Sequence, residues 1–143
     1  MERVAAAVEA ARSLDFPFTL TARTENFLRG NHELDETITR LQAFELAGAD
    51  VLFAPGPPSL DAVRAVCASV SKPVNFMVGI KGRSFSFAEL EAAGVRRVSL
   101  ATSLYRAAMT GLHAAATEVA EHGTFTYVDG NIDLHPFLES PES

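Results

Sequence analysis

Apolar and polar side chains alternate along the stretch Phe18-Thr19-Leu20-Thr21-Ala22-Arg23. Successive side chains of a β-strand point to opposite faces, so this stretch predicts a strand with one apolar and one polar face. The stretches 74–78 and 97–101 alternate in a similar way, whereas 51–54 is apolar throughout and does not discriminate between its faces. A strand buried between two helix layers is apolar on both sides, so these strands are expected to lie under helices on one face only.

Helix-forming segments lie between the predicted strands, because apolar residues recur in them at the spacing of one helical face. Strands that are joined through helices imply a parallel sheet with right-handed crossovers. The predicted strands cover 16–22, 50–54, 72–78 and 97–101, and the predicted helices cover about 3–14, 34–47, 59–70 and 86–93, with a long Ala-rich helix that ends near 122.

Capping residues mark several of these helix ends. Ser59 is expected to cap the third helix, and Ser86 with Glu89 forms the pattern of a capping box for the fourth. Gly48 and Gly94 each follow a helix and precede a strand, which suits the position just after a helix C-terminus. The local signals and the hydrophobic periodicity therefore agree on the element boundaries.

Composition and charge restrict the class of protein. The chain has 143 residues, with 12 Lys and Arg against 18 Asp and Glu, and a formal net charge of −6. This length predicts one domain over 1–143, and the acidic balance without a basic run argues against nucleic-acid binding. A single cysteine, Cys67, excludes a disulfide framework and fits a reducing, cytoplasmic location. No apolar run approaches the ~20 residues that span a bilayer, so no membrane association is expected.

The strand faces and the chain length together predict half of a TIM barrel. A polar strand face that ends in an arginine is typical of the lumen of a (β/α)8 barrel near its catalytic end. A complete barrel needs roughly 250 residues, and this sequence supplies about four strands and five helices. The expected fold class is therefore a parallel α/β half-barrel. Its last helix is followed by an apolar tail, about 124–143, that is expected to dock on another surface.

Five stretches in sequence order carry a family resemblance: Phe18–Phe27, Asp35–Phe44, Ala47–Gly56, Lys72–Asn75 and Gly123–Phe125. Together they resemble the isocitrate lyase/phosphoenolpyruvate mutase superfamily, in its phosphoenolpyruvate phosphonomutase-like branch. The resemblance covers essentially the whole chain and corresponds to strands five to eight of the family's barrel.

The resemblance implies a Mg²⁺-dependent lyase or mutase (an isomerase) that cleaves or forms C–C or P–C bonds. Its substrates would be small 2-oxo or 2-hydroxy carboxylic acids, which react through an enolate-like intermediate. In the family, Mg²⁺ is held through carboxylates on the earlier strands, and a loop of that half carries a catalytic cysteine. Neither feature has a match in this sequence, and Cys67 lies on the inward stripe of a predicted helix. The chain alone is therefore expected to hold no metal and no catalytic residue, and to be inactive without a complementing N-terminal half-barrel.

Arg23 matches the family arginine at the end of strand five, which contacts the anionic substrate, a small carboxylate or phosphonate. A guanidinium stays charged and grips such a group with two parallel hydrogen bonds, and the alternative is a salt bridge with Glu25. Thr24 and Glu25 follow in the same loop and are further candidate substrate-binding residues. Thr24 is expected to hydrogen-bond the oxygens of the substrate, and Glu25 is expected to orient Arg23. Asn75 is a further candidate substrate-binding residue on the polar strand face, with an interior hydrogen-bond network as the alternative.

Thr102 and Ser103 form a candidate anion-binding site at the start of the last helix. Their hydroxyls, together with the free N–H groups of the first helical turn, suit an anion. The alternative is that one of these two residues simply caps the helix.

An open sheet leaves two unpaired edges and an uncovered inner face, which predicts a homo-oligomer or a complex with a complementing half-barrel. The resemblance also implies oligomers, since family members exchange their last helices between subunits. Three functions stay open at this point. The chain is half of a lyase or mutase, a non-catalytic half-barrel that oligomerises and at most binds small anions, or a stand-alone module without chemistry.

Overall fold

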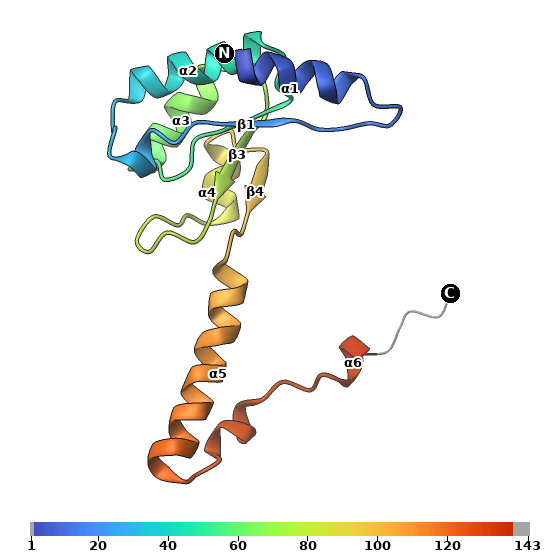
Figure 1. The fold of residues 1–143 in the computed structure, drawn as a ribbon. Coiled ribbons are helices and arrows are strands. Elements are labelled where there is room, and N and C mark those ends of the chain that lie inside the picture. The colour runs from blue at the N-terminus through green and yellow to red at the C-terminus, as the bar shows by residue number, and fades with distance from the viewer. Residues whose placement is uncertain (1, 139–143) are drawn as a thin grey trace. The chain divides into compact units, whose positions relative to one another are not determined.

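The computed structural model describes residues 2–138, in which four short strands alternate with five longer helices (Figure 1). Three shorter helical segments complete the described part: η1 (Phe27–Arg29), η2 (Thr126–Gly130) and α6 (His135–Leu138). The alternating elements are α1 (Glu2–Arg12), β1 (Thr21–Arg23), α2 (Leu34–Leu46), β2 (Val51–Phe53), α3 (Leu60–Ala68), β3 (Val74–Met77), α4 (Phe87–Ala92), β4 (Arg97–Ser99) and α5 (Ser103–His122).

The four strands form one parallel sheet in the order β1-β2-β3-β4. The predicted parallel half-barrel is therefore confirmed. The first strand is shorter than its predicted range of 16–22, because the partner strand β2 begins only at Val51, opposite Thr21. The Leu20 N–H instead donates to the Asp50 carboxylate at 2.8 Å. Arg12 also lies 2.6 Å from this carboxylate, and the two contacts hold the pKa of Asp50 below its usual value, with the Arg12 hydrogen bond as the larger cause.

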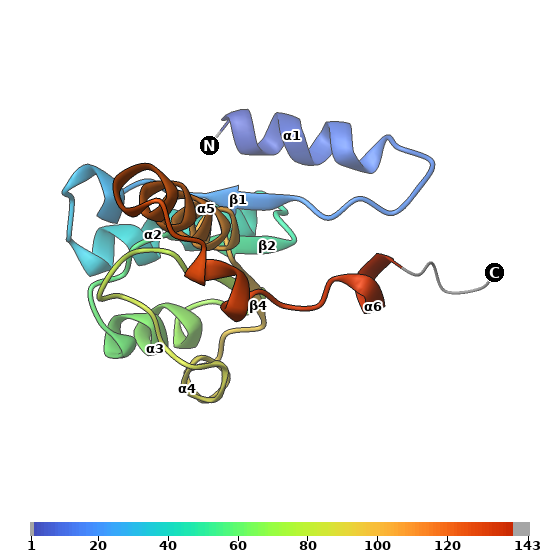
Figure 2. The same ribbon diagram turned by 90° about the horizontal axis from the view of Figure 1, so that it is seen from below.

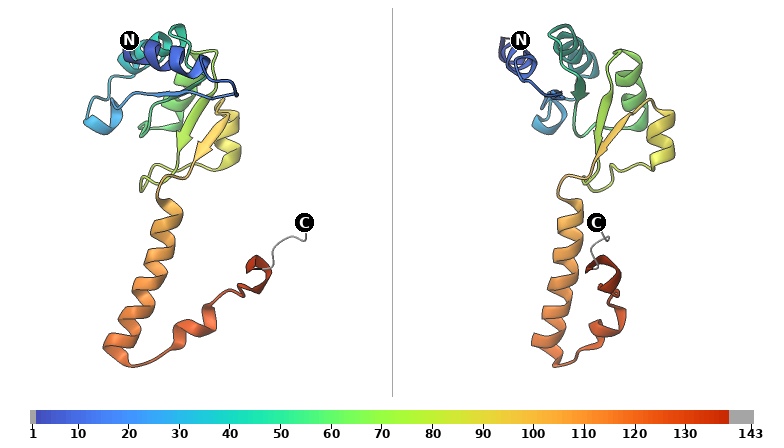
Figure 3. Two further views of the ribbon diagram at one scale, coloured as in Figure 1. Left: turned by 45° about the vertical axis from the view of Figure 1, so that its right-hand side comes forward. Right: turned by 90° about the vertical axis from the view of Figure 1, so that its right-hand side faces the viewer.

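The hydrophobic core lies on one face of the sheet. Ala22, Leu52 and Val74 pack with Leu41 and Phe44 of α2 in one buried cluster. A second cluster joins Phe76 of β3 to residues of α3 and α4. Figure 3 shows α3 and α4 on the same side of β3 and β4, and Figure 2 shows α1 running along β1. The apolar face predicted for the third strand is confirmed by Val74 and Phe76, and that of the first strand is confirmed at Ala22. Phe18, predicted on the same face as Ala22, lies before β1 and is 48% exposed.

The capping residues predicted from the sequence are confirmed. Ser59 Oγ accepts the N–H of Ala62 at 3.2 Å, and Ser86 and Glu89 form the reciprocal capping box of α4. Gly94, which follows α4, has a φ of 97°, a left-handed conformation that favours glycine. A side chain at Gly94 would also place its Cβ 2.9 Å from the Cβ of Cys67 on α3. Gly94 therefore allows both the turn and the close approach of the two helices.

Replacing Gly94 with alanine is expected to lower the free energy of unfolding by about 3 kcal/mol, from left-handed strain together with overpacking against Cys67. Gly82→Ala is the matched control, since Gly82 has a φ of 75° but nothing lies within 4 Å of the point that a Cβ would occupy there. The control is expected to lose only ~1 kcal/mol, from the strain alone. Urea unfolding of both variants measures the difference, and equal losses would show that the α3–α4 contact is not tight.

The chain divides into two compact units, one up to Ser103 and one from Leu104 onward. In the second unit, the segment that follows α5 is hydrogen-bonded to one carboxylate of this helix. Glu118 accepts hydrogen bonds from Thr124 Oγ1 (2.8 Å) and from the N–H groups of Thr126 (2.5 Å) and Tyr127 (3.2 Å). These bonds, led by that of Thr124, lower the pKa of Glu118. The last five residues of the predicted tail, 139–143, lie outside the described residues.

Within residues 2–138, none of the helices combines the length and the apolar character that a membrane crossing requires.

Candidate functional site

The inward face of the sheet, opposite the helices, carries the candidate site. Backbone register places Arg23, Phe53, Asn75 and Arg97 side by side across the four strands. Side chains in register on parallel strands share a face, so this row crosses the whole sheet. The inward face, defined by the strand positions on this side, consists of Thr21, Arg23, Val51, Phe53, Asn75, Met77, Arg97 and Ser99.

Arg23 is held at two points at the carboxyl end of β1. Its Nε donates to the Glu25 carboxylate, and its guanidinium carbon lies 5.0 Å from the centre of the Phe53 ring. A cation over an aromatic face is attracted by the ring's quadrupole. Among the described residues the two terminal nitrogens of Arg23 have no hydrogen-bond partner, which leaves the planar fork free for a carboxylate or phosphonate. Arg23 therefore forms the salt bridge with Glu25 through Nε while its two terminal nitrogens stay available for an anion.

Asn75 lies at the centre of an interior network. Its side chain is 2% exposed, and its Nδ2 donates to Ser99 Oγ at 3.0 Å. Its Oδ1 accepts from Arg97 Nη1 at 2.9 Å. Both ends of the amide are therefore engaged, as a buried amide requires. The network matches the alternative interpretation of Asn75, and a substrate contact of this residue stays a prediction.

Thr24 shapes the loop that follows Arg23. Its side chain is 3% exposed, and its Oγ1 donates to Asn26 Oδ1 at 2.9 Å. Its N–H continues the ladder to the Phe53 carbonyl at 2.9 Å. The Nδ2 of Asn26 is buried and makes no hydrogen bond among the described residues, although it lies near enough to Glu36 to help lower the pKa of that carboxyl. Thr24 is thus a loop contact, and its contact with substrate stays a prediction.

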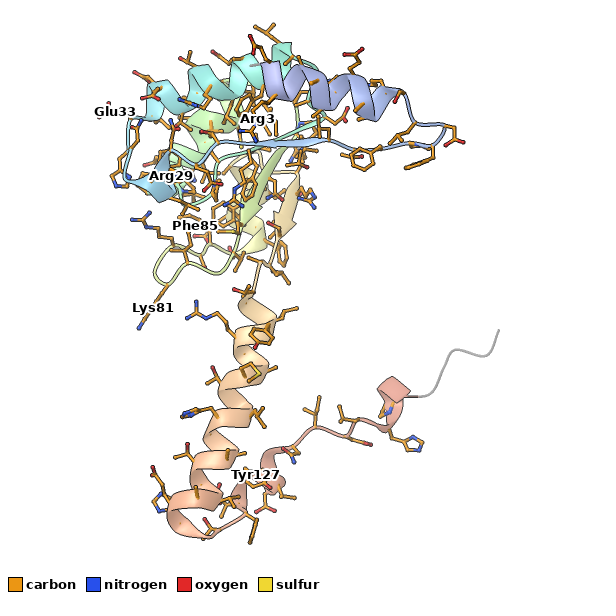
Figure 4. All side chains as sticks on the ribbon, viewed as in Figure 1. Arg3, Arg29, Glu33, Lys81, Phe85 and Tyr127 are labelled. Carbon is orange, nitrogen blue, oxygen red and sulfur yellow. The ribbon has the colours of Figure 1, made fainter. Side chains whose placement is uncertain are left out.

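A cavity of about 430 Å³ adjoins Arg23 on the side of this loop. Glu36 of α2 lies in its wall and accepts from Asn31 Nδ2 (2.7 Å) and from Arg40 (3.1 Å). These two contacts, Asn31 first, lower the pKa of Glu36. Arg29, the last residue of η1 and labelled in Figure 4, also lines the cavity. The lining holds three arginines against the two carboxylates Glu25 and Glu36, and this excess of positive charge suits an anion.

The loops after the first three strands meet at Gly56. A Cβ at this position would lie 2.9 Å from Leu28 and 3.4 Å from Ile80, and Arg83 Nη1 donates to the Gly56 carbonyl at 3.0 Å. Phe85, labelled in Figure 4, packs against Phe76 in a tilted arrangement, with the ring centres 5.7 Å apart. These contacts fix the third loop against the strands. The loops after β1, β2 and β3 therefore contact one another at the carboxyl end of the sheet, which is called here the mouth of the half-barrel.

The candidate anion site at Thr102 and Ser103 lies where α5 begins. Ser103 Oγ donates to the Leu100 carbonyl at 2.6 Å, so its hydroxyl supports the turn into the helix. Ala101, just before these residues, has a φ of 47°, which is uncommon for a residue with a side chain. The structure therefore gives the Ser103 hydroxyl a local partner, and anion binding at these two residues stays a prediction.

The residues that the structure describes do not fit a metal site. Within residues 2–138 no three His, Cys, Asp or Glu side chains converge. Glu25, the carboxylate in the loop after β1, is paired with Arg23. No step of a reaction is therefore assigned to a metal held by this chain.

Comparison with known proteins identifies the family. The family model of phosphoenolpyruvate phosphomutase matches residues 1–120, so the chain belongs to this family. A provisionally assigned lyase/mutase from Burkholderia cenocepacia J2315, called here the Burkholderia homologue, is 48% identical with a TM-score of 0.92. The alignment covers 99% of this chain and 52% of the homologue. None of the curated proteins matches the chain.

Two further solved structures are similar to this chain over about half of their own length. Oxaloacetate acetylhydrolase, solved with the inhibitor 3,3-difluorooxalacetate, is 25% identical to this chain, with a TM-score of 0.79. The alignment covers 94% of this chain and 46% of the hydrolase chain. Phosphonopyruvate hydrolase, solved with oxalate and Mg²⁺, is 24% identical with a TM-score of 0.72, over 92% and 46%, and shows the fold alone. The chain therefore spans about half the length of the solved relatives that it matches.

The sequence patterns alone do not identify three residues of the site. Phe53 lies in a stretch without alternation, Arg97 lies in a predicted strand without an assigned role, and Asn26 follows the two loop candidates. The alternation of the fourth strand pairs Arg97 with Ser99 on one face, and this signal is present in the sequence. The contact of Arg97 with Asn75 joins residues that are 22 positions apart, so it depends on strand register.

Proposed function

We propose that this chain forms the substrate-anion half of a lyase or mutase that breaks or forms a C–C or P–C bond beside a carboxylate. The observation that carries the proposal is the Arg23 fork, oriented by Glu25 and Phe53 at the mouth of the half-barrel. A planar guanidinium that is fixed at Nε offers two parallel N–H groups to a carboxylate or phosphonate. The substrate class would be small 2-oxo or 2-hydroxy carboxylic acids.

Mg²⁺ belongs to the proposed complete enzyme and not to this chain's own residues. The family relationship supports the metal, while residues 2–138 offer no converging ligand set. A second half-barrel would therefore have to supply both the metal ligands and the acid–base groups. In this arrangement Arg23 binds and orients the substrate anion, and Glu25 keeps the guanidinium in place. The proposed location is the cytoplasm, which the lone thiol of Cys67 suits.

Reconstitution tests the proposed function. The chain is co-expressed with the part of the Burkholderia homologue that it does not cover, and the product is assayed with Mg²⁺ against a panel of small 2-oxo acids, 2-hydroxy acids and phosphonopyruvate. We expect cleavage of at least one of these substrates by the complex and none by either half alone. A well-formed complex that turns over none of them would contradict the proposal.

A second candidate function rests on the unit from Leu104 onward. Its helix α5 buries none of its residues within the described part of the chain, and Tyr105, Leu112 and Phe125 are each more than 60% exposed. Monomeric proteins rarely leave so much apolar surface uncovered. This surface supports a homo-oligomer in which α5 packs on another subunit, and a half-barrel that only oligomerises and binds small anions would have the same surface. The reconstitution assay separates the two functions, because only the first gives turnover.

A further inference from the structure

Two buried side chains flank Glu25 in the loop after β1. Thr24 is 3% exposed and Asn26 is 9% exposed, and Thr24 Oγ1 donates to Asn26 Oδ1 at 2.9 Å. The carboxylate of Glu25, the residue between them, accepts from Arg23 Nε. A buried hydrogen bond between residues 24 and 26 restrains the backbone on both sides of Glu25. The direction of the Glu25 side chain therefore depends on this buried bond.

The backbone of this loop is fixed at both of its ends. The N–H of Thr24 donates to the carbonyl of Phe53 at 2.9 Å, which extends the ladder between β1 and β2 by one residue. Beyond Asn26, the N–H of Arg29 donates to the carbonyls of Glu25 (3.0 Å) and Asn26 (3.1 Å). The side chain of Asn26 makes no capping hydrogen bond to η1 among the described residues. The contact between Thr24 and Asn26 is thus a cross-link inside the turn, and the backbone bonds hold the two ends.

The ion pair that this turn supports is too exposed to order itself. The side chains of Arg23 and Glu25 are 42% and 39% exposed. An exposed ion pair contributes little stability, because its attraction is weak in water and because it has to order two flexible side chains. The loop must therefore place the Glu25 carboxylate before this pair can hold the Arg23 guanidinium over the Phe53 ring.

Burial keeps Thr24 and Asn26 from donating to a bound substrate. The hydroxyl proton of Thr24 is used by Asn26, and the Nδ2 of Asn26 is itself buried. These exposures belong to a half-barrel whose inward face is uncovered, and a second half-barrel can only reduce them. Neither side chain therefore offers a hydrogen-bond donor to an anion at the Arg23 fork. Their effect on such an anion has to pass through Glu25.

We infer that Thr24 and Asn26 are positioning residues, whose buried hydrogen bond orients Glu25 and, through it, the guanidinium of Arg23. This role takes the place of the substrate contact expected for Thr24. Its consequence for catalysis rests on the proposed function, in which Arg23 binds the substrate anion. Its consequence for Arg23 itself does not, because all of these contacts lie within this chain. A guanidinium that is already ordered loses less side-chain entropy on binding, so the buried bond is expected to lower KM.

Exchange of the Arg23 Nε proton with solvent, followed by NMR on the full chain, tests the inference. Thr24→Val removes the hydroxyl and keeps the branched shape. We expect it to raise the exchange rate at least fivefold, the factor that a typical hydrogen bond contributes, toward the rate of Glu25→Gln. Thr24→Ser keeps the hydroxyl and should stay within twofold of the wild-type rate. An unchanged rate in Thr24→Val would overturn the inference.

Thr39→Val is the matched control, because the Thr39 hydroxyl donates to the Asp35 carbonyl within α2, away from the turn. Its exchange rate at Arg23 should stay within twofold of the wild type. A rise equal to that of Thr24→Val would overturn the inference, since the effect would then be a general loosening of the fold. Asn26→Leu breaks the same buried bond from its acceptor side. It serves where Thr24→Val does not fold, with the same expected rise and the same contrary outcome.

Steady-state kinetics of the reconstituted enzyme give a second readout. Thr24→Val is expected to raise KM at least fivefold with a smaller change in kcat, and Thr24→Ser to recover the wild-type KM. A loss of kcat/KM in Thr24→Val without faster exchange at Arg23 would show that Thr24 contacts the substrate, and it would overturn the inference. The exchange measurement needs no turnover. Exchange rates as expected in a chain whose reconstituted complex is inactive would therefore refute the proposed function and leave the positioning of Arg23 standing.

Discussion

Replacing Arg23 with methionine is expected to lower kcat/KM of the reconstituted enzyme by about 100- to 1,000-fold, equivalent to ~3–4 kcal/mol of lost transition-state stabilisation. The guanidinium is fixed by Glu25 and the Phe53 ring, so its two terminal nitrogens are already oriented for a planar anion. Methionine keeps much of the length and the apolar stem of the side chain but removes the charge and all five donors. The substitution therefore removes binding and leaves the packing on Phe53 largely intact.

Two further variants sharpen this experiment. Arg23→Lys restores the charge without the fork and is expected to recover only part of the activity, because an ammonium binds as a point charge. Arg64→Met removes an exposed arginine that pairs with Asp61 on α3, and it should leave kcat/KM within twofold. Steady-state kinetics on the same substrate compare the three variants. A methionine variant that retains more than a third of the wild-type kcat/KM would show that Arg23 does not bind the substrate anion.

Replacing Asn75 with alanine is expected to lower the free energy of unfolding by about 2–3 kcal/mol, through a buried cavity and lost hydrogen bonds. The amide is 2% exposed and is held by Ser99 on one side and Arg97 on the other. Arg97 is exposed and can turn toward water. Most of the loss of stability therefore comes from the hydrogen bond to Ser99 and from the cavity that the missing amide leaves. Urea unfolding of the full chain, followed by circular dichroism, measures this loss.

Ser99→Ala and Asn75→Asp separate the parts of the network. Ser99→Ala removes a single hydrogen bond and is expected to lose ~1 kcal/mol. Asn75→Asp keeps an acceptor for Arg97 while losing the donor to Ser99, so its loss should be smaller than that of Asn75→Ala. If Asn75→Ala unfolds at the same midpoint urea concentration as the wild-type chain, Asn75 has no structural role, and a role in substrate contact alone is favoured.

Local signals in the sequence predicted the elements and most of the strand faces. Ser59, Ser86 and Glu89 act at their helix ends through contacts within three residues, so their patterns can be recognised without a fold. The alternation around Asn75 likewise predicted which side of β3 would be buried under helices, because strand side chains alternate whatever their neighbours are. From these patterns and the chain length, the parallel half-barrel followed.

Only the tertiary structure decided what the inward face contains. Every position of β2 is apolar and buried, so the sequence pattern of this strand does not distinguish its two faces. Only the packing of Leu52 under the helices shows that Phe53 lies on the face of Arg23. Arg97 reaches Asn75 across a crossover of 22 residues, a spacing that depends on the length of the intervening helix and loops. The sequence by itself thus determined the helices, the strands and the half-barrel. The row of Arg23, Phe53, Asn75 and Arg97 needed the register, because parallel strands bring together residues that no local pattern relates.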